Sequence, residues 1–266
     1  MKTQVNGIDV DYRDQDVGLP VLFIHAFPLN QTMWDEQVAA LRTHSRAITL
    51  DLRGFGKTDA PPGSYTMDQM AADVRGLMTV LEIDRAVLVG LSMGGYVSLA
   101  LYRNYPDVVG ALVLADTRAG ADTHAARERR LKSAEKAERD GARAIADDMI
   151  QLLVGRTTLE RRPAVVERVR KMIEANSPKG IAGAQRGMAE RRDSSYILAG
   201  IDFPTLIIVG DEDTLTPVAE AEGLRSGIRG ARLEVIDGAG HLSNLERPDK
   251  FNSVLIDFVN SLKESW

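Results

Sequence analysis

The chain has 266 residues, of which 44% are hydrophobic and 27% charged, and its formal net charge is −5 at pH 7. This composition is typical of a globular protein and excludes a disordered chain, a collagen and a coiled coil. With 33 basic against 38 acidic residues and no basic patch, the sequence does not favour nucleic-acid binding. The absence of cysteine excludes disulfides, thiolate metal sites and a cysteine nucleophile.

Short apolar runs, turn residues and helical patterns follow one another along most of the chain. Asn6-Gly7 tolerates the positive φ of a tight turn, so residues 8–12 are expected to form the second arm of a hairpin. Near-continuous aliphatic runs predict strands that are buried on both faces, at residues 21–24, 47–50, 86–89, 111–114 and 205–209. A further strand is expected at residues 232–236. Helical patterns lie between these runs, at about 33–43, 67–82, 93–105, 217–227 and 248–263. The alternation predicts a mostly parallel sheet with helices on both faces.

Residues 119–200 interrupt this alternation, because they contain helix-compatible sequence and no clear strand. We expect an inserted helical layer there. Residues 121–180 hold 14 Lys or Arg and 10 Asp or Glu, so this stretch carries +4 and the rest of the chain −9. Solvated helix faces with i,i+4 ion pairs are the favoured interpretation of this asymmetry. The stretch between Pro106 and Ser195 has no aromatic residue, so its inward face is expected to be aliphatic, with Met149, Ile150, Leu152, Leu153 and Val154.

Two observations bear on location. Residues 1–7 lack the apolar centre of a signal peptide, and apolar runs of about five residues are too short to span a bilayer. The sequence therefore predicts a soluble, cytoplasmic protein with no membrane partner.

The segment Gly90-Leu91-Ser92-Met93-Gly94 matches the pattern G-x-S-x-G between a predicted strand and a predicted helix. In this context the pattern is typical of a nucleophilic serine on a tight turn. Positions two before and two after the serine must be nearly free of side chains, which Gly90 and Gly94 allow. The turn also directs the first amides of the helix toward a group on the serine oxygen. Ser92 is the candidate nucleophile, and a helix start with incidental glycines is the alternative.

A nucleophilic serine needs a base that takes its proton, and the chain has four histidines. His44 ends a helical pattern and His124 lies among charged residues, so both are expected at the surface. His25 directly follows a predicted strand. His241 lies on a glycine-rich loop after the last predicted strand, where an imidazole can reach over the edge of a sheet. We therefore identify His241 as the candidate base, with a structural loop histidine as the alternative.

The base needs an acid that holds its tautomer. Three carboxylates follow one predicted strand on a single loop, Asp211, Glu212 and Asp213. The spacing to Pro217, which is expected in the first turn of the next helix, favours Asp213. The other two are expected to be turn and surface residues. Asp116, which also follows a predicted strand, is the alternative acid. The chain order nucleophile, acid, base agrees with one class of hydrolase fold.

With these residues the chain resembles the α/β-hydrolase superfamily over nearly its whole length. It is similar to the bacterial group of small carboxylesterases, enol-lactone hydrolases, acyl-homoserine-lactone hydrolases and cofactor-free perhydrolases. The resemblance implies an α/β-hydrolase fold with a mostly parallel, eight-stranded sheet, helices on both faces and an all-helical cap insert. The core is then expected at residues 1–118 and 196–266 and the cap at 119–195.

The resemblance also implies an oxyanion hole. In that group a His-Gly-x-Pro segment after the third strand supplies one amide, and the match here is His25-Ala26-Phe27-Pro28. The donors implied are the amides of Phe27 and Met93. Ala26 replaces the usual glycine, so the backbone is expected to avoid positive φ there.

A second segment of the family pattern lies at residues 51–58. It resembles the loop Asp-x-Arg-Gly-x-Gly-x-Ser, with Thr58 in place of serine. We interpret it as structural, with the charges of Asp51 and Arg53 shaping the loop.

Together these residues predict attack of Ser92 on an acyl carbonyl, with His241 as general base and an acyl-enzyme intermediate. The expected partner is a small-molecule ester or lactone. This chemistry requires no metal or cofactor, and the sequence has no histidine spacing typical of a metal site.

Substrate choice is expected to depend on the helical insert above Ser92. The candidate pocket residues are His25, Trp34, Met149, Leu152 and Leu153. Their character predicts an apolar acyl chain or ring beside the carbonyl, and therefore short to medium acyl esters and lactones. An acyl-homoserine lactone is a more specific candidate substrate, which rests on the resemblance alone.

Two alternatives remain open at this stage. The first is cleavage of a carbon–carbon bond, or perhydrolysis, by the same three residues. The second is a small-molecule-binding module that keeps the triad without turnover.

Overall fold

The computed structural model describes residues 1–15, 17–42 and 45–263. In this part of the chain eight strands form one sheet, in the order β1-β2-β4-β3-β5-β6-β7-β8. Strands β3 to β8 pair in parallel, and β2 is antiparallel to both of its neighbours. The predicted mostly parallel sheet is confirmed. The strands are β1 (Lys2–Val5), β2 (Ile8–Gln15), β3 (Pro20–Ile24), β4 (Arg46–Leu50), β5 (Ala86–Leu91), β6 (Val109–Ala115), β7 (Thr205–Gly210) and β8 (Arg232–Ile236).

The predicted hairpin joins β1 and β2. Asn6 and Gly7 have φ angles of 50° and 79°, which are the positive values that a tight two-residue turn requires. The strand after the turn extends to Gln15, three residues beyond the predicted end. These three residues pair with β4 and not with β1, so the strand continues beyond the hairpin.

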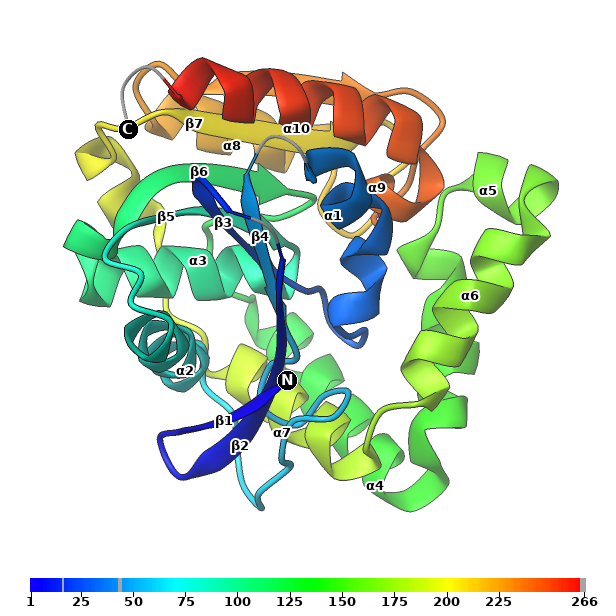
Figure 1. Cartoon of the computed structure of the whole chain (residues 1–266). Coiled ribbons are helices and arrows are strands. Elements are labelled where there is room, and N and C mark those ends of the chain that lie inside the picture. Colours follow the sequence, from blue (N-terminus) through cyan, green and yellow to red (C-terminus); the bar gives the residue numbers. More distant parts are fainter. Residues whose placement is uncertain (16, 43–44, 264–266) are drawn as a thin grey trace.

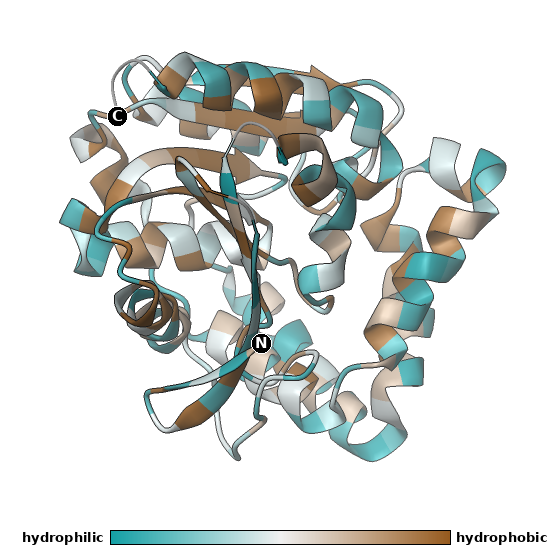
Figure 2. Ribbon diagram, in the orientation of Figure 1, coloured by the Kyte–Doolittle hydropathy of each residue, from teal (hydrophilic) through white to brown (hydrophobic). Residues whose placement is uncertain are grey.

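Burial differs between the centre and the edge of the sheet. Every residue of β5, β6 and β7 is buried, as their aliphatic sequences predict. The strand expected at residues 232–236 is confirmed as β8; it is the last strand of the sheet, and Val235 is 44% exposed. In Figure 2 the hydrophobic colour runs along the central strands.

Helices cover both faces of the sheet (Figure 1). Helix α1 packs against α10, and α2 packs against α3. The helices outside the insert are η1 (Gln31–Trp34), α1 (Asp35–Leu41), α2 (Met67–Val80), α3 (Met93–Asn104), η2 (Pro106–Val108), α8 (Val218–Gly227), α9 (Ser243–Glu246) and α10 (Pro248–Leu262). They agree with the five predicted helices, while the short helices η1, η2 and α9 are additional.

The chain between β6 and β7 is helical and contains no strand. Its helices are α4 (His124–Leu153), α5 (Arg156–Arg161), α6 (Pro163–Glu174), α7 (Pro178–Ala189) and η3 (Ser195–Gly200). We refer to α4 to α7 as the helical layer; it occupies the right and lower sides of the molecule in Figure 1. Helix α4 packs against α6 and α7 and is broken at Gly141, where φ is 84° and ψ 177°. The division of the chain at residues 118/119 and 195/196 stays a prediction.

Among the described residues, no helix combines the length and the apolarity that a membrane crossing requires.

Candidate active site

Ser92 lies on a tight turn between β5 and α3, at the carboxyl edge of the sheet. Its backbone has φ 55° and ψ −112°, a region that L-residues rarely adopt. A Cβ atom on Gly94 would lie 2.0 Å from the Ile24 carbonyl oxygen, and one on Gly90 would lie 2.4 Å from the Gly94 carbonyl oxygen. The glycines of the motif therefore let β3, β5 and the start of α3 approach one another around the serine.

The structure brings Ser92, His241 and Asp213 into one hydrogen-bonded row. His241 Nε2 lies 2.8 Å from Ser92 Oγ, and Nδ1 lies 2.8 Å from Asp213 Oδ2. With the imidazole proton on Nδ1, this nitrogen donates to the carboxylate and Nε2 accepts from the serine hydroxyl. The residues come from three loops that follow β5, β7 and β8, and Ser92 keeps 9% of its surface exposed.

Asp213 is held by the loop that it belongs to. The amides of Leu215 and Thr216 donate to Oδ1 at 2.8 and 3.0 Å, and the Thr216 hydroxyl donates to Oδ2 at 2.6 Å. Burial acts to raise the pKa of Asp213, but the facing imidazole of His241 and the Thr216 hydrogen bonds outweigh it and lower the pKa. The carboxylate is therefore kept ionised beside the imidazole.

Asp116, the alternative acid, has different partners. Its Oδ1 accepts from the Gly210 amide at 2.9 Å, and its Oδ2 accepts from the Ser243 hydroxyl at 2.5 Å. Burial and the nearby charge of Asp213 raise the pKa of Asp116 well above its ordinary value. Asp116 therefore links the strand that precedes Asp213 to the helix that follows His241.

The loop that carries His241 is fixed by Glu246 of α9. One carboxylate oxygen accepts from the amides of Gly240 and Leu242 at 2.9 and 3.2 Å, and the other accepts from the Gly155 amide at 2.8 Å. Gly155 lies between α4 and α5, so the same side chain joins the His241 loop to the helical layer. Sequence reasoning did not identify this residue, because its partners are backbone groups.

The two other acids of the Asp213 loop are structural. Asp211 accepts from the Gly238 amide at 2.7 Å and so closes the turn before His241. Glu212 was expected at the surface, but it accepts from the amide and the hydroxyl of Thr157 at 2.8 and 2.6 Å. It therefore forms a second connection between an active-site loop and the helical layer.

Of the implied oxyanion donors, Met93 follows Ser92 directly in the chain, and Phe27 lines the same cavity as Ser92. Met93 is the first residue of α3, so its amide has no acceptor within the helix. Phe27 follows β3, whose end approaches α3 at Gly94. Ala26 is absent from the described residues with positive φ, as its Cβ atom requires, and its amide donates to Met33 Sδ at 3.2 Å.

His25 holds this segment from within the core. The Leu52 amide donates to Nε2 at 2.9 Å, so Nδ1 carries the proton and donates to the Ala26 carbonyl at 3.0 Å. Burial lowers the pKa of His25, which favours the neutral ring that this arrangement needs. From the other side, Asn176 of the helical layer donates to the Pro28 carbonyl at 2.8 Å.

The loop at residues 51–58 has the structural contacts expected of it. Asp51 accepts from the amides of Gln31 and Lys57 at 2.8 and 2.9 Å, and Thr58 donates to the Asp51 carbonyl at 2.7 Å. Arg53 has no part in an ion pair with Asp51; its guanidinium binds Asp73 of α2 through two hydrogen bonds of 2.9 Å.

A cavity of about 640 Å³ opens beside Ser92 and His241. Met149, Leu152 and Leu153 line it, as expected from the sequence. His25 and Trp34 do not line it: both are fully buried, His25 in the contacts above and Trp34 against the rings of Phe23 and Phe251. Their expected place in the pocket is corrected, because both side chains point into the core.

Several polar residues that line the cavity were missed by the sequence reasoning. They are Tyr96, Arg118, Arg129, Arg130 and Gln185. The positive charge of residues 121–180 was the available signal for two of them, but it was interpreted as solvated helix surface. Nothing in the local pattern distinguishes an arginine that faces solvent from one that faces the cavity.

The two remaining histidines, His44 and His124, were both expected at the surface. His124 is the first residue of α4 and its side chain is exposed, as expected. His44 lies outside the described residues. Within the ranges that the structure describes, no three His, Asp or Glu side chains are grouped so that they could hold a metal ion.

Comparison with known proteins assigns the chain to a family. A family model described as alpha/beta hydrolase fold matches residues 20–248. The structure of a thermophilic esterase from Thermogutta terrifontis has 40% sequence identity and a TM-score of 0.95, covering 98% of this chain and 97% of that one. The enol-lactonase from Burkholderia xenovorans LB400 has 32% identity and a TM-score of 0.91, covering 98% and 100%. A 3-oxoadipate enol-lactonase 2 from Acinetobacter baylyi is 31% identical over 232 residues, which are 87% of this chain and 85% of that protein. Together with the sheet order and the strand-to-helix turn at Ser92, these matches show that the chain belongs to the α/β-hydrolase fold family.

Proposed function

We propose that the protein is a carboxylic-ester hydrolase that cleaves esters and lactones through Ser92, His241 and Asp213. The observation that carries the proposal is the buried row of these side chains, with 2.8 Å from hydroxyl to imidazole and 2.8 Å from imidazole to carboxylate. The similarity to an esterase and to enol-lactonases supports the same reaction class.

In the proposed mechanism, His241 Nε2 takes the Ser92 proton as the hydroxyl oxygen attacks the acyl carbonyl. Asp213, whose pKa is lowered, stabilises the imidazolium that forms. The tetrahedral oxyanion accepts hydrogen bonds from the amides of Phe27 and Met93. Loss of one such donor in an oxyanion hole raises the barrier by about 2.7–4 kcal/mol, so the position of the Phe27 peptide matters for the rate.

The acyl-enzyme is then cleaved by water. His241 returns its proton to the leaving alcohol oxygen and next activates the water, which attacks the Ser92 ester. A lactone follows the same two steps and releases one hydroxy acid, because its alcohol and acid belong to one molecule. Short to medium acyl esters and lactones suit the aliphatic wall that Met149, Leu152 and Leu153 give to the cavity. Acyl-homoserine lactones belong to the candidates because of the family resemblance alone.

The experiment that tests the proposal compares wild type with Ser92→Ala. The substrates are p-nitrophenyl esters from acetate to octanoate, simple lactones and acyl-homoserine lactones. We expect the wild type to cleave esters, and Ser92→Ala to reduce the rate to the background while the Tm stays nearly unchanged. Ser261→Ala on α10 is the matched control, since it removes one hydroxyl from an exposed residue that does not line the cavity. Undiminished cleavage by Ser92→Ala would refute the assignment of the nucleophile.

A further inference from the structure

The wall of the cavity carries an excess of positive charge. Arg118, Arg129 and Arg130 line the cavity, and Asp148 is the single acid among the lining residues that the structure describes. The Asp148 carboxylate accepts a hydrogen bond from Lys136 at 2.6 Å, so its charge is already matched. The cavity therefore offers positive charge to whatever molecule enters it.

Three arginines converge on one buried acid. Asp122 binds Arg118 Nη2 at 2.7 Å, Arg191 Nη2 at 3.2 Å and Arg130 through its Nε. The Asp122 side chain is fully buried, and one carboxylate balances only one of the three guanidinium charges. Glu220 lies 3.9 Å from Arg118 Nη1, beyond a hydrogen bond, and its own side chain is 41% exposed.

Part of the donor capacity of these arginines is unused. The Nε atoms of Arg118 and Arg191 are buried and have no hydrogen-bond partner within the described residues. Arg191 is 95% buried, since only 5% of its surface is exposed. Buried charged groups without an acceptor are costly. Arg118 lines the cavity, so an anion there would stabilise its charge through space, without a bond to the buried Nε atom.

Tyr96 connects this cluster to the catalytic serine. It lies one helical turn after Ser92 on α3 and lines the cavity, and its ring centroid is 3.9 Å from the guanidinium carbon of Arg191. An ester that reaches from Ser92 past Tyr96 therefore arrives at the arginines. Met149, Leu152 and Leu153 line the same cavity and suit the methylene groups between the two ends of such a substrate.

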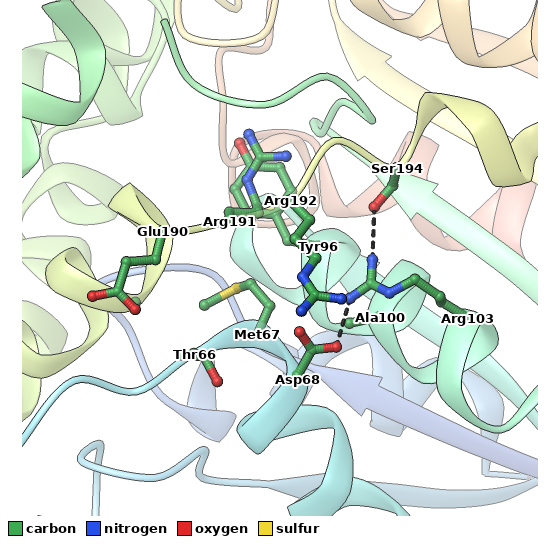
Figure 3. Close-up of a pocket in the computed structure, with 11 residues that line it drawn as sticks. Thr66, Met67, Asp68, Tyr96, Ala100, Arg103, Glu190, Arg191, Arg192 and Ser194 are labelled. Carbon is green, nitrogen blue, oxygen red and sulfur yellow. Dashed lines mark hydrogen bonds and ion pairs between the residues drawn. The ribbon is translucent and has the colours of Figure 1, made fainter. Parts of the chain in front are cut away.

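A second hollow, of about 180 Å³, is lined by Arg191 and shares Tyr96 with the larger cavity (Figure 3). There Arg103 donates to Asp68 at 2.6 Å and to Ser194 at 3.3 Å, and Glu190 also lines the wall. Its charges are more nearly balanced than those of the larger cavity. The unbalanced positive charge that could bind an anion is therefore in the larger cavity, beside Ser92.

We propose that the substrate is an ester or lactone that carries a carboxylate in addition to the group that is cleaved, and that Arg118 and Arg130 bind this carboxylate. The inference rests on the proposed function, since it concerns the same cavity. The guanidinium fork matches a carboxylate in two parallel hydrogen bonds, and Asp122 holds the forks in place before the substrate arrives. The substrate class is therefore an acid-bearing ester, such as a half-ester of a dicarboxylic acid.

The test compares matched pairs of esters with the wild type. One pair, mono-p-nitrophenyl pimelate and p-nitrophenyl heptanoate, differs by a carboxylate on the acyl half. The other, 4-carboxyphenyl butyrate and phenyl butyrate, differs by one on the alcohol half. In at least one pair we expect kcat/KM for the ester with the carboxylate to exceed that for the neutral ester by about tenfold or more. Hydrogen bonds to a charged group have energies of this size.

Substitutions of Arg118 then test whether this residue causes the preference for the acid-bearing ester. Arg118→Met is expected to reduce the acid-to-neutral ratio of kcat/KM by about 10- to 100-fold, and Arg118→Lys to reduce it less. Arg127→Met is the matched control: Arg127 is an exposed residue of α4 that does not line the cavity, so its loss leaves the ratio unchanged. Equal ratios for both Met variants would overturn the proposal, because the effect would then come from the general charge of the protein.

The wild-type result is decisive even where a variant does not fold. Cleavage of both neutral esters through Ser92 with no preference for either acid overturns this inference and leaves the proposed function intact. If the wild type cleaves no ester, or Ser92→Ala cleaves all of them equally well, the proposed function fails and this inference fails with it.

Discussion

Two buried aspartates at the carboxyl edge of the sheet have opposite roles. Asp213 faces the imidazole and has a lowered pKa, whereas Asp116 accepts from an amide and a hydroxyl and has a raised pKa. Neither residue type nor depth distinguishes them, since both are buried and both follow a strand. The imidazole that faces Asp213 distinguishes them, because it lowers the pKa of Asp213, whereas burial and the nearby charge of Asp213 raise the pKa of Asp116.

This contrast leads to a prediction on the acid of the triad. Asp213→Asn is expected to lower kcat by about 10⁴-fold, because the amide no longer stabilises the imidazolium or the tautomer with the proton on Nδ1. Asp116→Asn is expected to lower the Tm and to leave most of the turnover, since Asp116 links Gly210 to Ser243. The measurement is steady-state hydrolysis of p-nitrophenyl butyrate with thermal unfolding of both variants. If Asp116→Asn causes the larger loss in kcat, the acid has been assigned to the wrong residue.

For single residues, the sequence predicts those site positions that a local motif or spacing marks. Ser92 was selected as the candidate nucleophile from five consecutive residues, and Asp213 as the candidate acid from its spacing to Pro217, which precedes α8 as its N-cap. His25 and Trp34 were placed in the pocket because they are near Ser92 in the predicted topology. Their side chains point into the core, and the direction of a side chain after a strand depends on packing that a single sequence does not show.

At the scale of elements, the short helix α9 determines where the His241 loop lies. The Glu246 carboxylate accepts hydrogen bonds from three backbone amides, and two of these amides belong to the His241 loop. A carboxylate is suited to this position because it has only acceptors. Glutamine has almost the same shape but would turn an N–H group toward one of these amides.

Glu246→Gln is therefore expected to lower kcat more than it changes KM, because the base is displaced while the cavity remains. The lost acceptor is worth about 1–3 kcal/mol, which corresponds to a decrease in Tm of about 2–12 °C for a protein of this size. Asp249→Asn on α10 is the control, since that carboxyl is exposed. Kinetics and a melting curve of the two variants measure the effect, and a normal kcat in a destabilised Glu246→Gln would exclude a role in positioning His241.

The elements of the core could be predicted closely, but the helical layer could not. Alternation of aliphatic and helical runs is a strong signal, and it located the parallel strands within a few residues. The helices α4 to α7 follow one another without strands, so their boundaries depend on turns such as Gly141, whose positive φ is not marked by any pattern around it. Helix α9 has four residues and is too short to have a periodicity.

At the scale of the whole molecule, the helical layer and the sheet share buried polar contacts. Glu246 and Glu212 bind residues 155–157, and Asn176 binds the Pro28 carbonyl and the Gly56 amide. These contacts join three loops of the candidate site to the layer above it. Separation of the layer would leave several buried polar groups without partners, which is costly for each of them.

We therefore expect the layer and the sheet to unfold together. Calorimetry should show one transition, with a calorimetric enthalpy equal to the van't Hoff enthalpy. Asn176→Ala is expected to lower the temperature of that transition without splitting it. Two separate transitions in the wild type would show that the layer is a unit with its own stability.

The break at Gly141 has a consequence for how the cavity is built. The arm of α4 before the break carries Arg129 and Arg130, and the arm after it carries Met149, Leu152 and Leu153. The bend therefore separates the two lining arginines of α4 from its three aliphatic lining residues, and Asp148 is the charged lining residue of the second arm. Substitutions before the break are expected to change the preference for charged substrates, and substitutions after it the preference for acyl-chain length.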